Sequence, residues 1–89
     1  MIRGEVMIRD ELWSVSIKRI RAFFDSQPNV TPTDTGYQYG KCHITLTEVP
    51  PRDSAHFSIP RTQVVFDGLD ADVSEIYHSF MIQFLTTGG

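Results

Sequence analysis

The sequence is poor in cysteine and has no long apolar run. Its one cysteine, Cys42, has no second cysteine in the chain with which to form a disulfide. No stretch approaches the ~20 consecutive apolar residues that span a bilayer, and the charged N-terminal segment lacks the apolar core of a signal peptide. We therefore predict a cytoplasmic protein of a reducing compartment, with no disulfide framework and no membrane partner.

An excess of basic charge is also missing. Lys and Arg number 8 against 11 Asp and Glu, which gives a formal net charge of -3 and a pI of about 5.4. A protein that binds nucleic acid without regard to sequence needs a basic face. The short basic cluster of Lys18, Arg19 and Arg21 is interpreted as the solvated face of a helix, and we expect no nucleic-acid partner.

Glycine-rich phosphate loops and metal-ligand spacings are absent from the sequence as well. Asp67, Asp70 and Asp72 surround Gly68, but they lack the twelve-residue loop and closing Glu of a calcium site. His78 belongs to no Cys/His/Asp/Glu cluster with the spacing of metal ligands. We predict no metal site and no cofactor, and we interpret the acidic residues as a turn followed by a helix cap.

Aromatic residues, in contrast, are plentiful. The 89 residues include six Phe, three Tyr and one Trp, and 40% of the chain is hydrophobic. This composition predicts one small globular domain at residues 9–87, preceded by a loose arm or short edge strand at residues 1–8. A chain of this size buries a modest fraction of its surface, so a homodimer that shares apolar surface is a plausible source of stability.

The segment from residue 9 to residue 25 has the apolar spacing of an amphipathic helix. Polar residues lie off the apolar stripe, and Pro28 follows shortly after its end. We therefore predict one helix over residues 9–25. The stripe comprises Leu12, Trp13, Ile17, Ile20, Phe23 and Phe24.

The middle of the chain changes to a period of two, which predicts strands. Residues 28–36 are rich in turn formers and predict a loop, and residues 37–49 predict a strand with a bulge at Gly40. Consecutive prolines cannot donate ladder hydrogen bonds, so strand pairing is expected to stop at residues 49–54. Beyond them we predict two short strands separated by a turn at Pro60-Arg61, with one long edge strand as the alternative.

The last part of the chain predicts a second helix after a turn at Asp67-Gly68. Asp72 and Glu75 have the spacing of a capping box. The helix is apolar around most of its circumference, which is typical of a helix buried on more than one side. So small a protein has few other elements to cover this helix, and we therefore expect a protein interface here. The alternative is an apolar helix end on a monomer. The expected interface residues are Tyr77, Phe80, Met81 and Phe84.

These elements predict an α+β fold, a two-layer sandwich in the order helix, two or three antiparallel strands, helix. The order resembles the double-stranded-RNA-binding domain in outline. That module needs a basic start to its second helix, whereas the segment here reads Asp-Ala-Asp-Val-Ser-Glu, which repels phosphate. The fold class is therefore expected without the RNA-binding function.

Two tetrapeptides, His43-Ile-Thr-Leu and His56-Phe-Ser-Ile, share the pattern His-apolar-hydroxyl-apolar. The pattern resembles the paired motif of the two-histidine phosphoesterases. The resemblance implies a general base and a general acid at the two histidines, with Thr45 and Ser58 holding a phosphodiester. The motifs here are 13 residues apart, and a hairpin register with Leu46 opposite Phe57 separates the histidines by about 13 Å along the strands. The competing interpretation is a wet, polar face of the sheet.

The terminal Gly88-Gly89 is similar to the tail of ubiquitin-like sulfur carriers, which implies activation at the terminal carboxylate. Those carriers reach the tail from a strand, whereas the segment before this tail predicts a helix. Cys42 shares the inward face of its strand with Ile44 and Leu46, which predicts a buried thiol and no nucleophile.

The sequence as a whole predicts a small protein-interaction or oligomerisation domain without catalytic machinery, whose partner is another protein or a second copy in a homodimer. A phosphoesterase-like enzyme using His43 and His56, and a sulfur carrier, are the alternatives.

Overall fold

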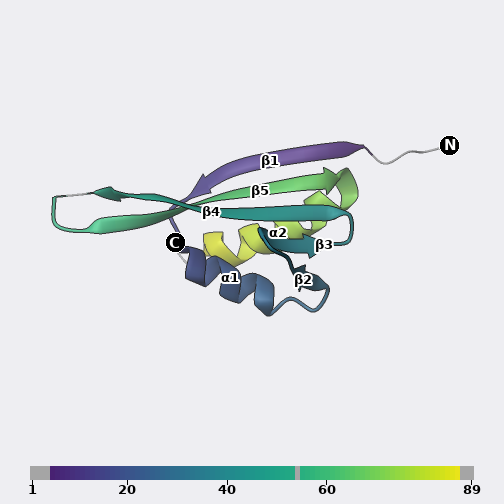
Figure 1. The fold of residues 1–89 in the computed structure, drawn as a ribbon, viewed down its shortest axis with the longest axis horizontal. Helices are drawn as coiled ribbons and strands as arrows, with labels where there is room; N and C mark the ends of the chain where they lie inside the picture. Colours follow the sequence, from purple (N-terminus) through teal and green to yellow (C-terminus); the bar gives the residue numbers. More distant parts are fainter. Residues whose placement is uncertain (1–4, 54, 87–89) are drawn as a thin grey trace.

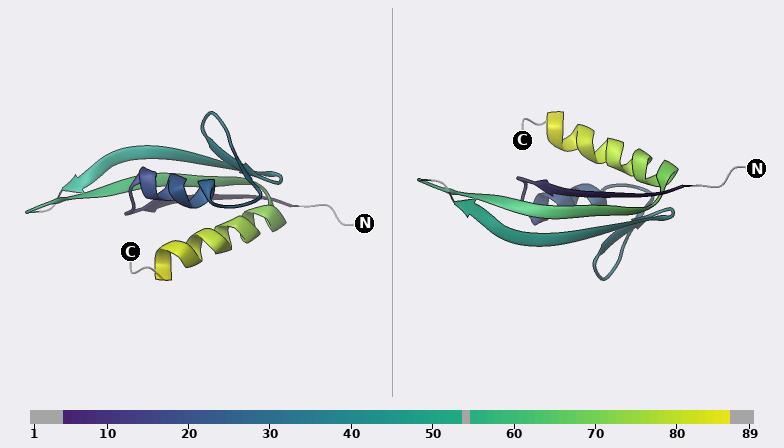
Figure 2. Two further views of the ribbon diagram at one scale, coloured as in Figure 1. Left: turned by 90° about the horizontal axis from the view of Figure 1, so that it is seen from below. Right: turned by 90° about the horizontal axis from the view of Figure 1, so that it is seen from above.

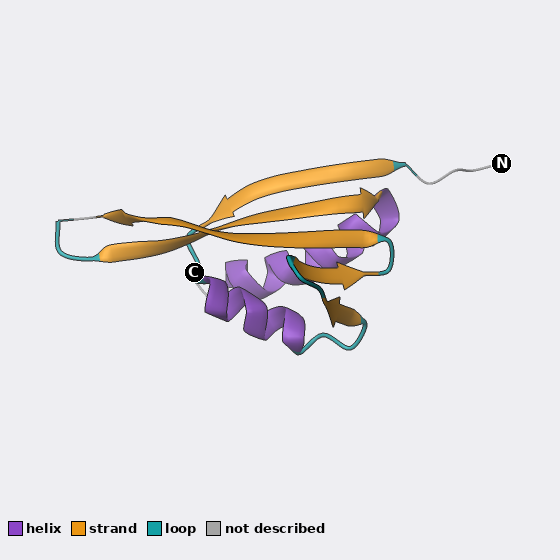
Figure 3. Ribbon diagram, viewed as in Figure 1, coloured by secondary structure: helices purple, strands orange, loops and turns teal. Residues whose placement is uncertain are grey.

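The computed structural model describes residues 5–53 and 55–86 as one antiparallel sheet with two helices on one of its faces (Figure 1). The five strands lie in the order β1-β5-β4-β3-β2. Figure 3 shows both helices below strands β1, β5 and β4, and Figure 2 shows α2 running obliquely along the sheet. The elements are β1 (Val6–Trp13), α1 (Ile17–Asp25), β2 (Val30–Pro32), β3 (Gly36–Tyr39), β4 (Cys42–Asp53), β5 (Ser58–Leu69) and α2 (Asp70–Thr86).

The predicted fold class is wrong in its strand content and order. A helix–strand–helix sandwich with two or three strands was expected, whereas the sheet has five strands and the first element is a strand. The class remains α+β, but strands hold more residues than helices do, 39 against 26 in the described elements. The errors come from three places, the start of the first helix, the turn at Gly40 and the proline-containing segments.

The predicted helix over residues 9–25 begins only at Ile17. Strand β1 occupies Val6–Trp13 and pairs with β5 over eight residues without a bulge. Ser16 caps the helix, because its hydroxyl accepts a hydrogen bond from the backbone N–H of Arg19. The hydroxyl of the buried Thr62 donates to the carbonyl of Val15 at 2.7 Å, which fixes the corner between β1 and α1.

The predicted bulge at Gly40 is a hairpin turn instead. Tyr39 pairs with Cys42, so Gly40 and Lys41 form a two-residue connection between β3 and β4. Gly40 has a φ of 56°, and Lys41 has no positive φ. That pattern is typical of a type II′ turn with glycine at its first central position. The predicted loop at 28–36 holds a short strand, β2, which pairs with β3.

The predicted end of strand pairing at the prolines is also wrong. The β4–β5 ladder shifts register between Val49 and Arg52 and then continues to Asp53, opposite Ser58. The irregularity accommodates Pro50 and Pro51, and the carbonyl of Pro50 accepts two hydrogen bonds from the Arg61 side chain. As a result β4 and β5 form one long hairpin that projects beyond the helices (Figure 1).

Helix α2 is confirmed, and it follows β5 directly at Asp70 without a separate turn at Asp67-Gly68. Its first turns are tied to the β3–β4 hairpin. The Asp72 carboxylate accepts a hydrogen bond from the backbone N–H of Lys41 at 2.8 Å, and Glu75 accepts one from the hydroxyl of Tyr39. These two acidic residues therefore anchor a hairpin and do not form the predicted capping box.

Phe80 is the centre of the hydrophobic core. Its side chain has no exposed surface, and its ring lies 5.7 Å from the ring of Phe24 in a stacked arrangement and 5.0 Å from Trp13 edge-on. The same ring contacts Phe66 on β5, so both helices and two strands meet at one residue. The inward parity predicted for β4 is confirmed. The core comprises Val15, Ile20, Phe23, Phe24, Tyr37, Cys42, Ile44, Leu46, Val64, Phe66, Val73, Ile76, Phe80 and Phe84.

We expect Phe80→Ala to lower the free energy of unfolding by about 3–5 kcal/mol, because truncating a buried Phe leaves a cavity among rings that cannot all collapse into it. Urea denaturation measures the change. Phe80→Leu keeps most of the apolar volume and is expected to cost about half as much or less. Leu85→Ala, at a side chain that is 61% exposed, is the control and is expected to change stability by about 0.5 kcal/mol or less. Equal losses at positions 80 and 85 would contradict the central role of Phe80.

Candidate functional site

The two edges of the sheet differ in how far they are open to another strand. At one edge, β2 is three residues long and contains Pro32. Short length and proline are both features that keep an edge strand from pairing with another chain. At the other edge, β1 is eight residues long, contains no proline, and is the outermost strand in Figure 1. Strand β1 is therefore the edge that is able to accept a further strand.

The backbone groups that β1 turns outward follow from its pairing with β5. The N–H of Asp70 donates to the carbonyl of Glu5, in the register that pairs Val6 with Leu69. Hydrogen-bonded and non-hydrogen-bonded pairs alternate in an antiparallel ladder. Residues of odd number in β1 therefore bond to β5, and those of even number turn their N–H and C=O groups away from the sheet. The even residues are Val6, Ile8, Asp10 and Leu12.

Three apolar side chains on β1 lie in solvent. Val6 is 74% exposed, Ile8 is 64% exposed and Leu12 is 54% exposed. All three project from the sheet face opposite the helices, together with Asp10. The Asp10 carboxylate accepts a hydrogen bond of 2.9 Å from the side-chain amide of Gln63 on β5. The edge thus combines unpaired backbone groups with an exposed apolar stripe.

The odd side chains of β1 point to the helix side and form a polar network with Tyr77. The guanidinium of Arg9 lies 4.0 Å from the centre of the Tyr77 ring and 3.3 Å from the Glu11 carboxylate. Glu11 also accepts hydrogen bonds from the Tyr77 hydroxyl and from the indole N–H of Trp13. Hydrogen bonding to Tyr77, ahead of the influence of Glu11, raises the pKa of Arg9. A fixed positive and a fixed negative charge therefore lie two residues apart on the edge strand.

The open face of the sheet continues from β1 across β5 and β4. Ile8 lies opposite Asp67, which in turn lies opposite His43, and Val65 lies opposite Thr45. His43 is exposed and Thr45 is partly exposed. Apolar exposure on this face is concentrated on β1, and the neighbouring strands add mainly polar side chains.

The interface residues predicted on α2 take two different positions. Phe80 has no exposed surface and Phe84 is 3% exposed, so both belong to the core. Tyr77 and Met81 are partly exposed, and Tyr77 is held by its contacts with Arg9 and Glu11. The sheet and α1 cover most of the apolar circumference that suggested an interface on this helix. The exposed apolar residues that remain on α2 are Ile82 and Leu85.

The two histidines of the phosphoesterase-like motifs lie far apart. His43 is opposite Asp67 near the body of the sheet, whereas His56 lies in the turn of the projecting hairpin, beyond the pair Asp53 and Ser58. Ten strand positions from residue 43 to residue 53 correspond to about 30 Å. Ser58 donates its hydroxyl hydrogen bond to Asp53 at 2.8 Å. Within one chain the four residues of this motif pair do not share a pocket.

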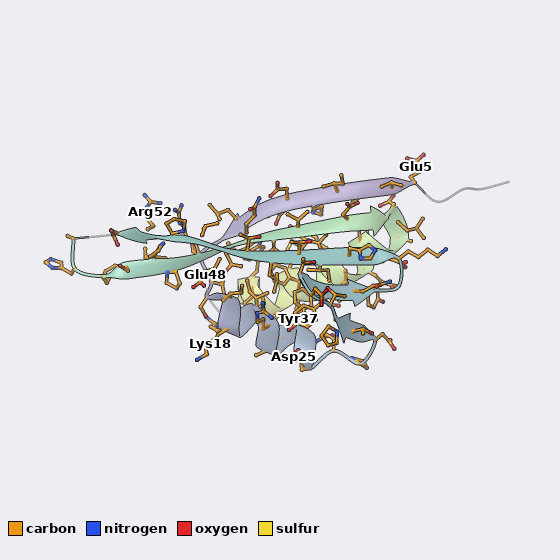
Figure 4. All side chains as sticks on the ribbon, viewed as in Figure 1. Glu5, Lys18, Asp25, Tyr37, Glu48 and Arg52 are labelled. Atoms are coloured by element: carbon orange, nitrogen blue, oxygen red, sulfur yellow. The ribbon has the colours of Figure 1, made fainter. Side chains whose placement is uncertain are left out.

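The side chains in Figure 4 show the character of the remaining surface. Arg52 lies on the projecting hairpin and Lys18 on α1, well separated from each other. Tyr37 and Asp25 lie together beneath the sheet, where the Tyr37 hydroxyl donates to the Asp25 carboxylate at 2.9 Å. Burial, followed by this hydrogen bond, raises the pKa of Tyr37. This pair ties β3 to α1 and has a structural role.

The Gly88-Gly89 tail lies outside the described residues, and the described chain approaches it from a helix. Within residues 5–53 and 55–86, no three His, Cys, Asp or Glu side chains are grouped closely enough to hold a metal ion. None of the helices in the described part of the chain is long and apolar enough to cross a membrane.

The sequence allowed a short edge strand at residues 1–8, but the extension of this strand to Trp13 was not predicted. Leu12 and Trp13 were placed on one helical stripe, whereas they point to opposite faces of a strand. The available signal was the pair of serines at positions 14 and 16, either of which is a good helix N-cap. A helix start at Ser16 would have left residues 6–13 free to form a strand.

Comparisons with known proteins identify no relative: no protein-family model matches the chain, and no curated protein and no solved structure is significantly similar to it. The edge described above is therefore interpreted from its own chemistry.

Cys42 is expected to be unreactive in the native protein. Burial raises the pKa of its thiol from 9.0 to about 11, so little thiolate is present near pH 8. A maleimide reagent should label the native chain slowly at pH 8 and label it fully in urea, as followed by intact mass. Rapid labelling of the native protein would contradict this.

The same shift makes a prediction for alkaline stability. The unfolded chain loses the thiol proton near pH 9.0 and the native protein near 11, so the unfolding free energy falls as the pH rises above 9. Cys42→Ala removes this contribution. The difference in unfolding free energy between the two proteins at each pH therefore separates the effect of the thiol from that of the tyrosines. Parallel alkaline denaturation profiles for the two proteins would contradict the prediction.

Proposed function

We propose that this chain is a small protein-binding domain that takes up a strand at its β1 edge. The observation that carries the proposal is the exposed eight-residue edge, with four residues whose backbone groups turn outward and three exposed apolar side chains. Strand addition to an open sheet edge is a recurring mode of protein recognition, in which main-chain hydrogen bonds supply affinity and alternate side chains supply specificity.

The layered architecture supports this mode of binding. Both helices cover one face of the sheet, so an incoming strand at β1 extends the sheet without displacing either helix. The polar network of Arg9, Glu11 and Tyr77 holds the edge in place from the helix side. A rigid edge loses little conformational entropy on binding, which favours association.

The cellular setting that we propose is the cytoplasm. The free thiol of Cys42 is buried and unpaired, and proteins that rely on no disulfide are typical of reducing compartments.

The proposal is tested by a proline at position 8. Because the N–H of Ile8 turns away from β5, Ile8→Pro leaves the β1–β5 ladder intact but removes an outward donor. Ile8→Ala keeps that donor and is the matched control. We expect the proline variant to keep the circular dichroism spectrum of the wild type and to lose about tenfold or more in affinity for any protein that the wild type binds, as measured by quantitative capture from the native host. The alanine variant should lose less.

Two outcomes would contradict the proposal. One is a partner retained equally by the wild type and by the folded Ile8→Pro protein, which would place binding elsewhere. The other is an equal loss for the proline and alanine variants, which would assign the effect to the side chain and not to backbone pairing.

A further inference from the structure

We propose that the strand taken up at the β1 edge is β1 of a second copy of this chain, paired antiparallel about a two-fold axis at Asp10. This inference rests on the proposed function and names its partner. It rests on charge complementarity between Arg9 and Glu11, which the structure fixes on one side of the edge.

Symmetry limits the registers that are possible. Two identical edge strands that pair antiparallel are related by a two-fold axis perpendicular to the sheet, so each residue meets one from the same face. The axis then passes midway between one residue and the same residue of the second copy, so that these two lie directly opposite each other. Within the charged centre of β1 the axis has three possible positions, at Arg9, Asp10 or Glu11.

The axis at Asp10 is the one of these three that sets opposite charges against each other. Arg9 then lies opposite Glu11 of the second copy, and Glu11 lies opposite Arg9 of the second copy. An axis at Arg9 or at Glu11 also places a like-charge pair on the axis, which is unfavourable, and it lacks the two Arg9–Glu11 pairs that offset this repulsion in the Asp10 register. In the favoured register Arg9 and Glu11 form a non-hydrogen-bonded pair, the type in which opposite side chains lie closest.

The apolar residues of the edge meet in the same register. Ile8 lies opposite Leu12 of the second copy, twice about the axis, and both side chains are mostly exposed in the single chain. Trp13 lies opposite Met7 of the second copy on the helix side. The outward N–H and C=O groups of Ile8, Asp10 and Leu12 all find partners, since each of these residues falls in a hydrogen-bonded pair.

The one unfavourable contact is Asp10 with its own copy on the axis. The hydrogen bond from Gln63 to each Asp10 carboxylate reduces this repulsion but does not remove the charges. An interface built on one edge strand is also small beside the ~20–30 residues per partner of a stable complex. We therefore expect a weak dimer whose formation depends on protein concentration.

Charge exchange tests the register. Arg9→Glu places two carboxylates opposite each other, and Glu11→Arg places two guanidinium groups opposite each other. In sedimentation velocity, each variant alone should dimerise about tenfold or more weakly than the wild type, since each change alters two symmetric contacts. An equimolar mixture should recover dimers of near wild-type affinity, because the mixed dimer contains two Glu–Arg pairs.

The mixture separates pairing between chains from a structural role. Each single variant lacks the Arg9–Glu11 pair within its own chain, both alone and in the mixture. A change in folding therefore cannot explain association that returns on mixing. Glu5→Arg is the matched control, since it makes the same charge change on the same chain outside the paired positions. It should not complement Arg9→Glu. Complementation by Glu5→Arg in place of Glu11→Arg would move the axis to Met7 and overturn the register.

Asp10→Asn is expected to strengthen the dimer about threefold or more, because it removes the like-charge pair and keeps an oxygen for Gln63. Asp34→Asn, at an exposed position outside the strands, removes the same charge and should leave the affinity unchanged. Equal effects of the two variants would contradict an axis at Asp10.

A wild-type protein that stays monomeric at millimolar concentration would overturn the second copy as partner. If the proline at position 8 nevertheless abolished capture of a different protein, binding at the β1 edge would stand and only the identity of the strand would fall. If the proline variant kept both capture and self-association, binding at the β1 edge and the second copy as partner would both be overturned.

Discussion

The packing of Phe80 against both layers is the contact on which the rest of the structure depends. Its ring touches Trp13 of β1, Phe24 of α1 and Phe66 of β5, so one side chain of α2 joins the edge strand, the other helix and the centre of the sheet. Since both helices converge on this ring, both lie on the same face of the sheet. The opposite face is left without cover as a direct consequence.

That arrangement moves the surface available for binding from the second helix to the first strand. An apolar helix in a small protein suggests an interface, but a five-stranded sheet offers enough area to bury most of it. The same sheet creates a long edge, whose outward backbone groups lack partners within the described chain. In the proposed dimer, the charges of Arg9 and Glu11, which contact Tyr77, complement those of an identical strand.

Sequence patterns predicted the parts of the fold that depend on local spacing. Helix α2 and the inward parity of Cys42, Ile44 and Leu46 were predicted correctly, because α2 is a long apolar segment without turn formers and β4 alternates with a period of two. The spacing argument failed for the first eight residues of the expected helix, 9–16, because a separation of four, such as that of Trp13 and Ile17, occurs with or without a helix between them. The prolines at positions 50 and 51 misled for a different reason, because the ladder shifts register around them and resumes at Arg52 instead of ending.

The sequence by itself determined a small α+β chain with one free thiol, an aromatic core, an apolar second helix and an acidic balance of charge. These properties follow from composition and from spacing along the chain. Tertiary structure alone decided that residues 6–13 form a strand, that this strand lies at an edge, and that Phe80 and Phe84 are core. Those outcomes depend on pairing with β5, 49 to 63 residues away in the sequence, and no local pattern encodes the energy of a contact at that separation.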